Sequence, residues 1–543
     1  MARYLGSGCG VQVEQMPRPP VRSARATLTM AAFLLALAGP AAAATQASWN
    51  GAAGTATWST AGNWSTGTAP AGELGQLTLP AVGPGCGDWG CAYGVDDTGA
   101  LTVGTLALDA AAGYLVRPLA PADRITLLHG LLFGSSVAAS GGPLDSTFAV
   151  PLALGAGQRW NVSGVPGTPT ALQLGAVTGA SYPLTVALAS GVTLGTPEMD
   201  TGPLTLVGAG TLQLTGTGAA QPADGVASSP PPLLSRHGTR LEDGASLELS
   251  SGGTVAGPIT VAPGSPSMLA IGDGVAPDGT AVVNGSVVLR ASSTLSLWID
   301  QPAPAGLHRP RPGTDYSQLI VLGSLDLNGA TLALTQGYTD SQVACAALEP
   351  GQTYTLAEAT RLTGTFAGIA NGQAVGLGAC DPLAATTAAV VVRYNTATRP
   401  QSITATVIGD AQARALVAQA LAPPPPAAAS ALGLLRAGGY TETFDAPAAG
   451  TLALSWATRV HGRLLTIARA SNSAGQAGPR RLPIRLTLTG TRLLRFLARA
   501  AQRRRPNARV AALTVTASAS FTPGAMSSPT LTPVTIHRTI RLG

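Results

Sequence analysis

The clearest pattern in the chain is a short alternation of apolar and polar residues that glycine interrupts. Residues 202–216 read GPLTLVGAGTLQLTG, with leucine at 204, 206, 212 and 214 and glycine at 208 and 210. An apolar residue at every second position predicts a β-strand with one buried face. The central glycines predict a tight turn that needs a positive φ or a close approach of the backbone. The segment is therefore expected to form a short strand, a turn and a second short strand.

Related phrases recur along the chain, which suggests a repeated unit. They are GALTVGTLALDA at 99–110, GASLELSSGGTVAGPITV at 244–261, GSVVLRASSTLSLWI at 285–299 and GSLDLNGATLALT at 323–335. A β unit this small cannot bury its apolar face alone, so it stacks on its neighbours. Units of about 22–25 residues predict roughly fifteen coils. Two proline-rich stretches, Gln221–Arg240 and Gln301–Tyr316, are expected to leave the stack as loops.

The first residues have the pattern of an export signal. Arg22 and Arg25 precede the apolar run 31–37, and three alanines at 42–44 offer a cleavage site. We therefore expect residues 1–44 to be a signal peptide. The run is too short to span a bilayer, and no later segment reaches the required apolar length, so we expect no integral membrane span.

The segment that follows is rich in tryptophan. Trp49, Trp58 and Trp64 lie within TQASWNGAAGTATWSTAGNWSTGTAP at 45–70. A stack of coils has an open apolar end, and large flat side chains could cover it. The alternative is a carbohydrate platform, because exposed tryptophan rings stack on sugars.

The last part of the chain follows a different pattern. Asp410–Leu421 favours a helix that prolines end, so residues 409–428 are interpreted as a linker. Beyond it, strand-like alternation resumes, interrupted by TRLLRFLARAAQRRR at 491–505. Leu493, Leu494, Leu497 and Ala498 fall on one helical face there. About seven strands with one short helix suggest a β-sandwich at 429–543.

Composition supports two regions of opposite charge. The chain has 543 residues, which is long for a single core, and its net charge is +6 with no lysine. Residues 45–426 carry 12 arginines and 23 acidic residues, whereas residues 427–543 carry 16 arginines and only two acidic residues. The acidic region should repel nucleic acid, and the basic region could meet an anionic surface. Arg492, Arg495, Arg499, Arg503, Arg504 and Arg505 are the candidate contacts, with cell-wall polymer or lipid headgroups as the anion. The alternative interpretation is a solvated helix face.

Cysteine usage agrees with export. Beyond the predicted signal the chain has an even number of cysteines, Cys86, Cys91, Cys345 and Cys380. An even number of cysteines in an exported chain predicts that they form disulfides. Metal binding is disfavoured, because the Cys-x4-Cys pair has no histidine near it in the sequence. We identify no metal site and no cofactor site.

The repeated phrase at 202–216 resembles the autotransporter-associated β-strand repeat. The opening WSTAGNWSTGTAP at 58–70 is similar to the start of such passenger domains, and 314–407 resembles their closing coils. The tail, with GGYTETFDAPAAGTLALSW and RLPIRLTLTGTRLLRFLARAAQRRR, resembles an Ig-like module of secreted proteins from GC-rich Gram-positive bacteria. The resemblance implies an all-β fold: a right-handed parallel β-helix at 45–408, followed by a small Ig-like β-sandwich with one short helix. It implies the passenger shape and not a secretion route, and it carries no catalytic residue.

An enzyme on this scaffold remains an alternative, because β-helices also host polysaccharide lyases and hydrolases. Such sites need clustered carboxylates. The candidates are Glu198 with Asp200, Glu242 with Asp243 and Arg240, and Asp273 with Asp278. Ser235 and His237 are close in sequence but lack a nucleophile elbow around them. A solvated turn is the preferred interpretation of each carboxylate pair, so we assign no catalytic residue.

The expected function is therefore that of a secreted or cell-surface structural or interaction protein. A β-helical stalk would act in adhesion or surface display, with a glycan, a cell-wall polymer or a neighbouring surface protein as partner and no nucleic acid. The location would be extracellular and associated with the cell wall. This expectation rests on fold-level analogy.

Overall fold

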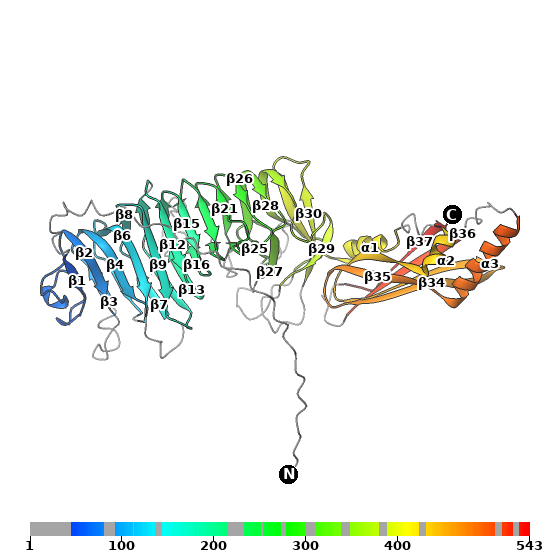
Figure 1. Cartoon of the computed structure of the whole chain (residues 1–543), viewed down its shortest axis with the longest axis horizontal. Coiled ribbons are helices and arrows are strands. Elements are labelled where there is room, and N and C mark those ends of the chain that lie inside the picture. Colours follow the sequence, from blue (N-terminus) through cyan, green and yellow to red (C-terminus); the bar gives the residue numbers. More distant parts are fainter. Residues whose placement is uncertain are drawn as a thin grey trace, which may run out of the picture. The chain divides into compact units, whose positions relative to one another are not determined.

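The protein is mostly β-structure. The computed structural model describes residues 45–542 except for 81–92, 112, 136–143, 180, 216–232, 251–252, 273–278, 300–309, 338–347, 379–387, 423–429, 505–512 and 525–530. Strands account for 56% and helices for 9% of the structure. The all-β class expected from the alternation is confirmed, and the long parallel sheets are of the β-helix-like kind (Figure 1). The predicted signal peptide at 1–44 lies outside the described residues.

Two sheets build residues 45–407, which we call the coil stack. The larger sheet has 21 strands. They are β1 (Gln46–Ser48), β2 (Glu73–Leu79), β4 (Ala100–Asp109), β6 (Arg124–Gly134), β8 (Leu152–Leu154), β9 (Gln158–Gly164), β11 (Val177–Gly179), β12 (Leu184–Leu188), β14 (Met199–Thr201), β15 (Leu204–Val207), β17 (Leu233–Leu234), β18 (Thr239–Glu242), β20 (Thr254–Val255), β21 (Ile259–Val261), β23 (Thr280–Val283), β24 (Val287–Val288), β26 (Gln318–Asp326), β28 (Thr353–Thr363), β29 (Gln373–Gly376), β30 (Ala389–Asn395) and β31 (Gln401–Val407). The second sheet contains β3 (Tyr93–Asp96), β5 (Leu115–Pro118), β7 (Leu144–Phe148), β10 (Thr170–Leu174), β13 (Val192–Thr196), β16 (Thr211–Leu214), β19 (Ser246–Leu249), β22 (Met268–Ile271), β25 (Thr294–Ile299) and β27 (Thr331–Gln336).

Each central coil adds one rung to both sheets. From β8 to β25 the chain repeats the same order: two short strands in the larger sheet, then one strand in the second sheet. Pairing between successive coils is parallel, as between β12 and β15 or β16 and β19. The segment 202–216 forms β15 and β16, one in each sheet, as the alternation predicts. Gly208 between them has a φ of 97°, a conformation that favours glycine, so its turn is the corner between the two sheets.

The expected number of coils is wrong. The ten strands of the second sheet mark ten coils in the described residues, not fifteen. Paired leucines are 18 residues apart from Leu194 to Leu212 but 37 apart from Leu295 to Leu332. Coil length varies because insertions leave at the corners, where they do not disturb the backbone pairing. Part of the predicted loop 221–240 is also in the stack, as β17 and the start of β18, and residues 310–316 form a compact turn with Tyr316 buried at its end.

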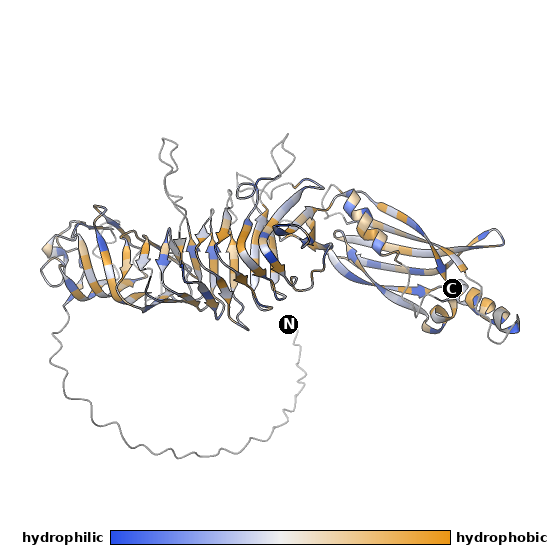
Figure 2. Cartoon of the chain, turned by 90° about the horizontal axis from the view of Figure 1, so that it is seen from above, coloured by the Kyte–Doolittle hydropathy of each residue, from blue (hydrophilic) through white to orange (hydrophobic). Residues whose placement is uncertain are grey.

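Leucine columns fill the interior of the coil stack. In the second sheet one column places a leucine directly over another through seven successive strands, at Leu172, Leu194, Leu212, Leu247, Leu269, Leu295 and Leu332. All of them are buried. Orange positions recur along the strands of the stack in Figure 2. The alternation in the sequence therefore becomes a continuous apolar core, because parallel register keeps equivalent residues on the same face.

The N-terminal segment 49–65, which we call the cap, closes the first coil. Trp49, Trp58 and Trp64 are at most 3% exposed. Their rings meet edge to face, with centroids 5.1 Å apart for Trp49 and Trp64 and 5.5 Å for Trp58 and Trp64. The cap interpretation is confirmed for these three side chains. Because the rings are buried, they offer no platform for a sugar.

Asn63 holds the cap together. Its side-chain amide donates to the carbonyl oxygens of Thr55 (2.9 Å) and Thr57 (3.1 Å) and accepts from the amide of Ala53 (3.0 Å). The backbone continues the sheets, because the Trp58 amide donates to the carbonyl of Val95 in β3 and the Trp49 amide donates to that of Thr78 in β2. The cap is thus tied to both sheets.

The stack ends differently at its other side. β28, β30 and β31 pair antiparallel, as do β29 and β30. The expectation that 314–407 would close the stack with further parallel coils is therefore wrong for the last three strands. An antiparallel strand needs only a short turn, so the chain can finish the sheet without another full coil.

Residues 410–542, which we call the C-terminal module, contain one six-stranded antiparallel sheet and three helices. In chain order these are α1 (Asp410–Gln419), α2 (Ala431–Ala437), β32 (Gly439–Ala446), β33 (Gly450–Val460), β34 (Arg463–Ala474), β35 (Gly478–Leu486), α3 (Leu488–Arg504), β36 (Leu513–Pro523) and β37 (Val534–Leu542). The strand order is β32-β35-β34-β33-β36-β37. β34 and β35 share only two residue pairs, so the sheet divides into a two-stranded and a four-stranded part.

The module differs from the expected sandwich in three respects. Six strands are described in place of about seven, they belong to one sheet, and α3 has 17 residues and begins at Leu488. Inward side chains of both parts of the sheet join one buried cluster, including Phe444, Trp456 and Phe521. The helix expected at 410–421 is present as α1. It is not a free linker, because Leu416 and Val417 are buried in the same cluster.

The leucine column predicts a clear contrast between the two faces of a strand. Replacing Leu247 by alanine should lower the free energy of unfolding by about 2–5 kcal/mol, because the fixed rungs above and below cannot collapse into the cavity. Thr205→Ala, on the outer face of β15, should change it by no more than about 0.5 kcal/mol. Urea unfolding of the full chain measures both. Equal effects would show that the column is not the source of stability.

The cap makes a second prediction. Asn63→Ala leaves the carbonyls of Thr55 and Thr57 and the amide of Ala53 without this partner, so unfolding should become easier by about 2–3 kcal/mol. Asn161→Ala, at an exposed position of β9, is the matched control and should have little effect. Tryptophan fluorescence during thermal unfolding measures the change, because three of the seven tryptophans of the chain are in the cap. A wild-type transition in the Asn63 variant would contradict the assigned role.

Candidate functional site

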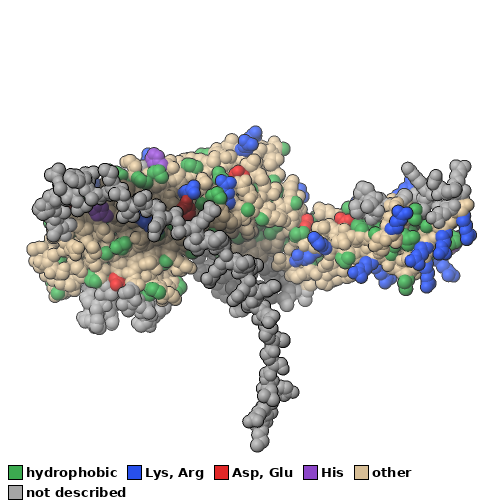
Figure 3. Space-filling model, viewed as in Figure 1, with side chains coloured by type: hydrophobic (Ala, Val, Ile, Leu, Met, Phe, Trp, Pro, Cys, Tyr) green, Lys and Arg blue, Asp and Glu red, His purple; other side chains and the backbone are tan. Residues whose placement is uncertain are grey.

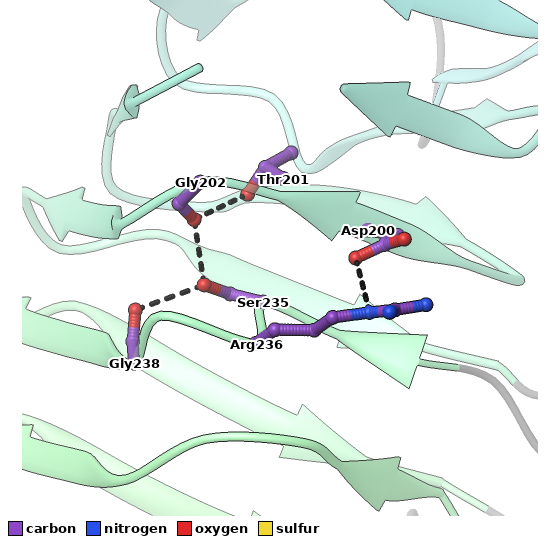
Figure 4. A network of polar contacts seen from close by, with 6 residues as sticks. All are labelled: Asp200, Thr201, Gly202, Ser235, Arg236 and Gly238. Carbon is purple, nitrogen blue, oxygen red and sulfur yellow. Dashed lines mark hydrogen bonds and ion pairs between the residues drawn. The ribbon is translucent and has the colours of Figure 1, made fainter. Parts of the chain in front are cut away.

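The serine and histidine singled out by the sequence do not form a catalytic pair. Ser235 is fully buried, and its hydroxyl donates to the carbonyl oxygens of Gly202 (2.6 Å) and Gly238 (3.0 Å), as Figure 4 shows. The Gly202 carbonyl belongs to the preceding coil, so the hydroxyl links two rungs. His237 is exposed. The Ser235 hydroxyl donates its proton to backbone carbonyls and is shielded from solvent. It therefore cannot act as a nucleophile.

Two of the described candidate carboxylates, Asp200 and Glu242, each contact one arginine. Asp200 faces Arg236, with Oδ1 and Nε 3.4 Å apart (Figure 4), and Glu242 pairs with Arg240, its neighbour on the same face of β18. Asp243 lies in the following turn with a φ of 52°. Asp273 and Asp278 lie outside the described residues. Asp200 and Glu242 are therefore explained as arginine–carboxylate contacts of the stack, and no ion pair is found for Glu198 or Asp243 among the described residues.

No metal centre is found in the part of the chain that the structure describes. His, Cys, Asp and Glu side chains there form no group of three or more that could hold an ion. Cys86, Cys91, Cys345 and Cys380, the four cysteines of the predicted disulfides, lie outside the described residues. The Trp49, Trp58 and Trp64 rings are inside the cap. Within the residues that the structure describes, the basic module remains a charged candidate surface.

The outward face of α3 is the strongest charged feature. Arg492, Arg495, Arg499 and Arg503 are exposed, and Leu494 on the opposite face is 1% exposed. The interpretation of residues 491–505 as an amphipathic helix is confirmed up to Arg504, and Arg505 lies outside the described residues. Two large apolar side chains stand among the arginines: Leu488 is 80% and Phe496 is 68% exposed. Their spacing of eight residues places them on one helix face.

The module has almost no negative charge to balance its arginines. Its acidic residues beyond 426 are Glu442 and Asp445, both on β32. Burial raises the pKa of each carboxyl, because the charged form loses water. The ion pairs found among the described residues all lie in the coil stack. In Figure 3 most blue side chains of the visible face lie on the module, several of them over α3.

A second basic feature was not anticipated from the sequence. The outer face of the module sheet carries a hollow of about 680 Å³, which we call the sheet hollow. Its polar lining comprises Arg469, Arg485, Ser455, Ser471, Ser518 and Ser520, among other residues. The signal was present in RASNS at 469–473, where arginine and serine occupy alternate positions, and in PIR at 483–485, which supplies the second arginine. Only the strand pairing shows that these segments meet.

None of the helices in the described residues has the length and apolar composition needed to cross a bilayer. The expectation of no membrane-spanning helix holds for that part of the chain. The exposed arginines of α3 lie on a helix that rests on its own module through Leu494. They are therefore presented at the surface of the module.

Ser235 gives a prediction that separates structure from catalysis. Ser235→Ala removes the hydroxyl bond between coils and should lower the free energy of unfolding by about 1–3 kcal/mol. Ser296→Ala, on the outer face of β25, is the control and should be close to neutral. A fluorophosphonate reagent should not label Ser235 in the folded protein, because the side chain is buried and its proton is shared with carbonyls. Labelling that Ser235→Ala abolishes would restore the nucleophile hypothesis.

Comparison with known proteins adds no relative. No protein-family model, no curated protein and no solved structure matches this chain. The choice among functions therefore depends on the geometry of the chain itself. The features that bear on that choice are the regular outer face of the stack and the basic surface of the module.

Proposed function

We propose that this is a secreted, cell-surface structural or interaction protein, in which the coil stack is displayed and the C-terminal module holds it on an anionic cell-wall polymer. The observation that carries the proposal is the outward face of α3, with four exposed arginines and no acidic residue on the helix. A regular row of guanidinium groups fits a polymer with repeating negative charge. The basic, apolar and small-residue pattern of residues 1–44 supports export.

The coil stack supports the display part of the proposal. Its parallel rungs form one continuous hydrogen-bonded structure, and threonine recurs on the outer face of its strands. Asp200 and Glu242 are engaged by Arg236 and Arg240, and the Ser235 hydroxyl is bonded to backbone carbonyls. Display of a polar surface needs no further chemistry. A right-handed winding, a relationship to passenger-type repeats and an Ig-like ancestry of the module belong to the same proposal.

The α3 arginines provide the test of this function. The full chain should sediment with cell walls that carry a polyol-phosphate polymer, and the bound fraction should fall steeply between 50 and 300 mM salt, roughly as the Debye length shortens. Replacing Arg492, Arg495, Arg499 and Arg503 by glutamine removes four positive charges. This variant should bind the walls at least tenfold more weakly. The measurement is a binding isotherm at each salt concentration.

A matched variant controls for net charge. This variant replaces four exposed arginines of the coil stack by glutamine. They are Arg124, Arg159, Arg361 and Arg393. This variant should bind the walls like the wild type. Equal loss in both variants would show that only total charge matters, and undiminished binding of the α3 variant would refute the attachment role.

A further inference from the structure

The outer face of the module sheet has two arginines side by side without a compensating charge. Arg469 of β34 is directly opposite Arg485 of β35, and both side chains are exposed. Like charges directly opposite each other in a sheet are destabilising. Neither arginine is part of an ion pair found among the described residues. The only acidic residues beyond 426, Glu442 and Asp445, are on β32 and not in the lining of the sheet hollow.

Hydroxyl groups continue the row of arginines across the sheet. Arg469 is opposite Ser455 of β33, Ser455 is opposite Ser518 of β36, and the two hydroxyls are 2.8 Å apart. The neighbouring row contributes Ser471 and Ser520, which are opposite Ala453. Small side chains in both rows leave room above the backbone, so the face is hollow where the arginines stand at its edge.

A β-bulge explains why the sheet is concave at this point. Trp456 is opposite Ala468 and Ala457 is opposite Thr466, so Ile467 has no partner on β33. An extra residue bends its strand and increases the local twist. Ile467 and Ala468 are both buried, so the bulge shifts the alternation of faces by one residue and Arg469, the next residue, lies on the outer face. The bulge therefore positions the arginine pair beside the serines.

We infer that the sheet hollow is a binding site for a sugar phosphate, with Arg469 and Arg485 on the phosphate and the serine hydroxyls on the sugar. A phosphomonoester carries a charge of about −1.5 to −2 at neutral pH, which matches two guanidinium groups, whereas a carboxylate carries only one negative charge. The planar donor fork of arginine suits phosphate oxygens. The volume of about 680 Å³ exceeds that of a phosphate group and admits a sugar ring.

This site goes beyond the attachment role of α3, since it lies on β33 to β36 and recognises one small ligand. Attachment through α3 needs a row of charges along a polymer. The sheet hollow needs two charges and hydroxyl donors at one place. The two surfaces can therefore fail independently in an experiment.

Glucose 6-phosphate, glucose and glucuronate are suitable probes for calorimetric or NMR titration of the full chain. Glucose 6-phosphate should bind, glucose should not bind measurably, and glucuronate should bind at least tenfold more weakly than the phosphate. Arg485→Gln should raise the dissociation constant for glucose 6-phosphate at least tenfold, and Arg469→Gln should do the same. Arg541→Gln, an exposed arginine of β37 outside the hollow, is the control and should leave it unchanged.

Thermal unfolding separates loss of the site from loss of the fold. Arg485→Gln should not lower the midpoint temperature, because it removes one of two like charges that face each other. The fourfold α3 variant should retain sugar phosphate binding even if wall attachment is lost. The inference is overturned if Arg485→Gln binds glucose 6-phosphate like the wild type, or if glucuronate binds as tightly as the phosphate.

Discussion

Parallel hydrogen bonding from coil to coil is the constraint on which the structure depends. It fixes each rung directly above the previous one, so a residue at one position repeats the environment of its counterpart. The seven stacked leucines from Leu172 to Leu332 follow from this register. A one-residue slip would turn every one of them towards water. The constraint acts only on the strands, which is why segments of quite different length can lie between paired residues.

The sequence predicted the stack because its information is local and repeated. Alternation of apolar and polar residues marks the strands, and glycines with a positive φ, such as Gly208, mark the corners. Both signals can be read without reference to distant residues. The number of coils could not be predicted, since insertions at corners have no fixed length. The antiparallel strands β29 to β31 also carry the same alternation as parallel ones, and only their partners distinguish them. Direction of pairing is a property of the whole sheet.

Candidate sites could be predicted where their residues are close in the sequence, and not where they come from distant segments. The arginine face of α3 could be recognised from helical spacing, because all of its residues lie in one short segment. Arg469 and Arg485 could not, since β34 and β35 must first pair before the two side chains meet. Ser235 shows that a site suggested by the sequence can be absent from the fold. The serine is near a histidine in the sequence, but its side chain is buried and its hydroxyl donates to the carbonyl of Gly202, so it stabilises the stack. Proximity in sequence indicated chemistry where the fold provides none.

The coil stack and the C-terminal module differ in core packing and in charge. The coil stack obtains its stability from leucine burial and carries more acidic than basic residues, whereas the module concentrates positive charge on a short sheet and one helix. The arginine-rich surface of the module therefore adds no like-charge neighbours to the strands of the stack. The module tolerates such neighbours at Arg469 and Arg485, which is consistent with a role for that pair outside stability.

The cap has a consequence for behaviour in a crowded solution. The first strand of a parallel sheet leaves a row of amides and carbonyls that another chain could adopt as a template. By folding residues 49–65 across both sheets, with three tryptophans and Asn63 beneath, the chain occupies that row with its own backbone. Growth of one molecule onto the next, as in a fibre, is thereby blocked at this end by a segment of fewer than twenty residues.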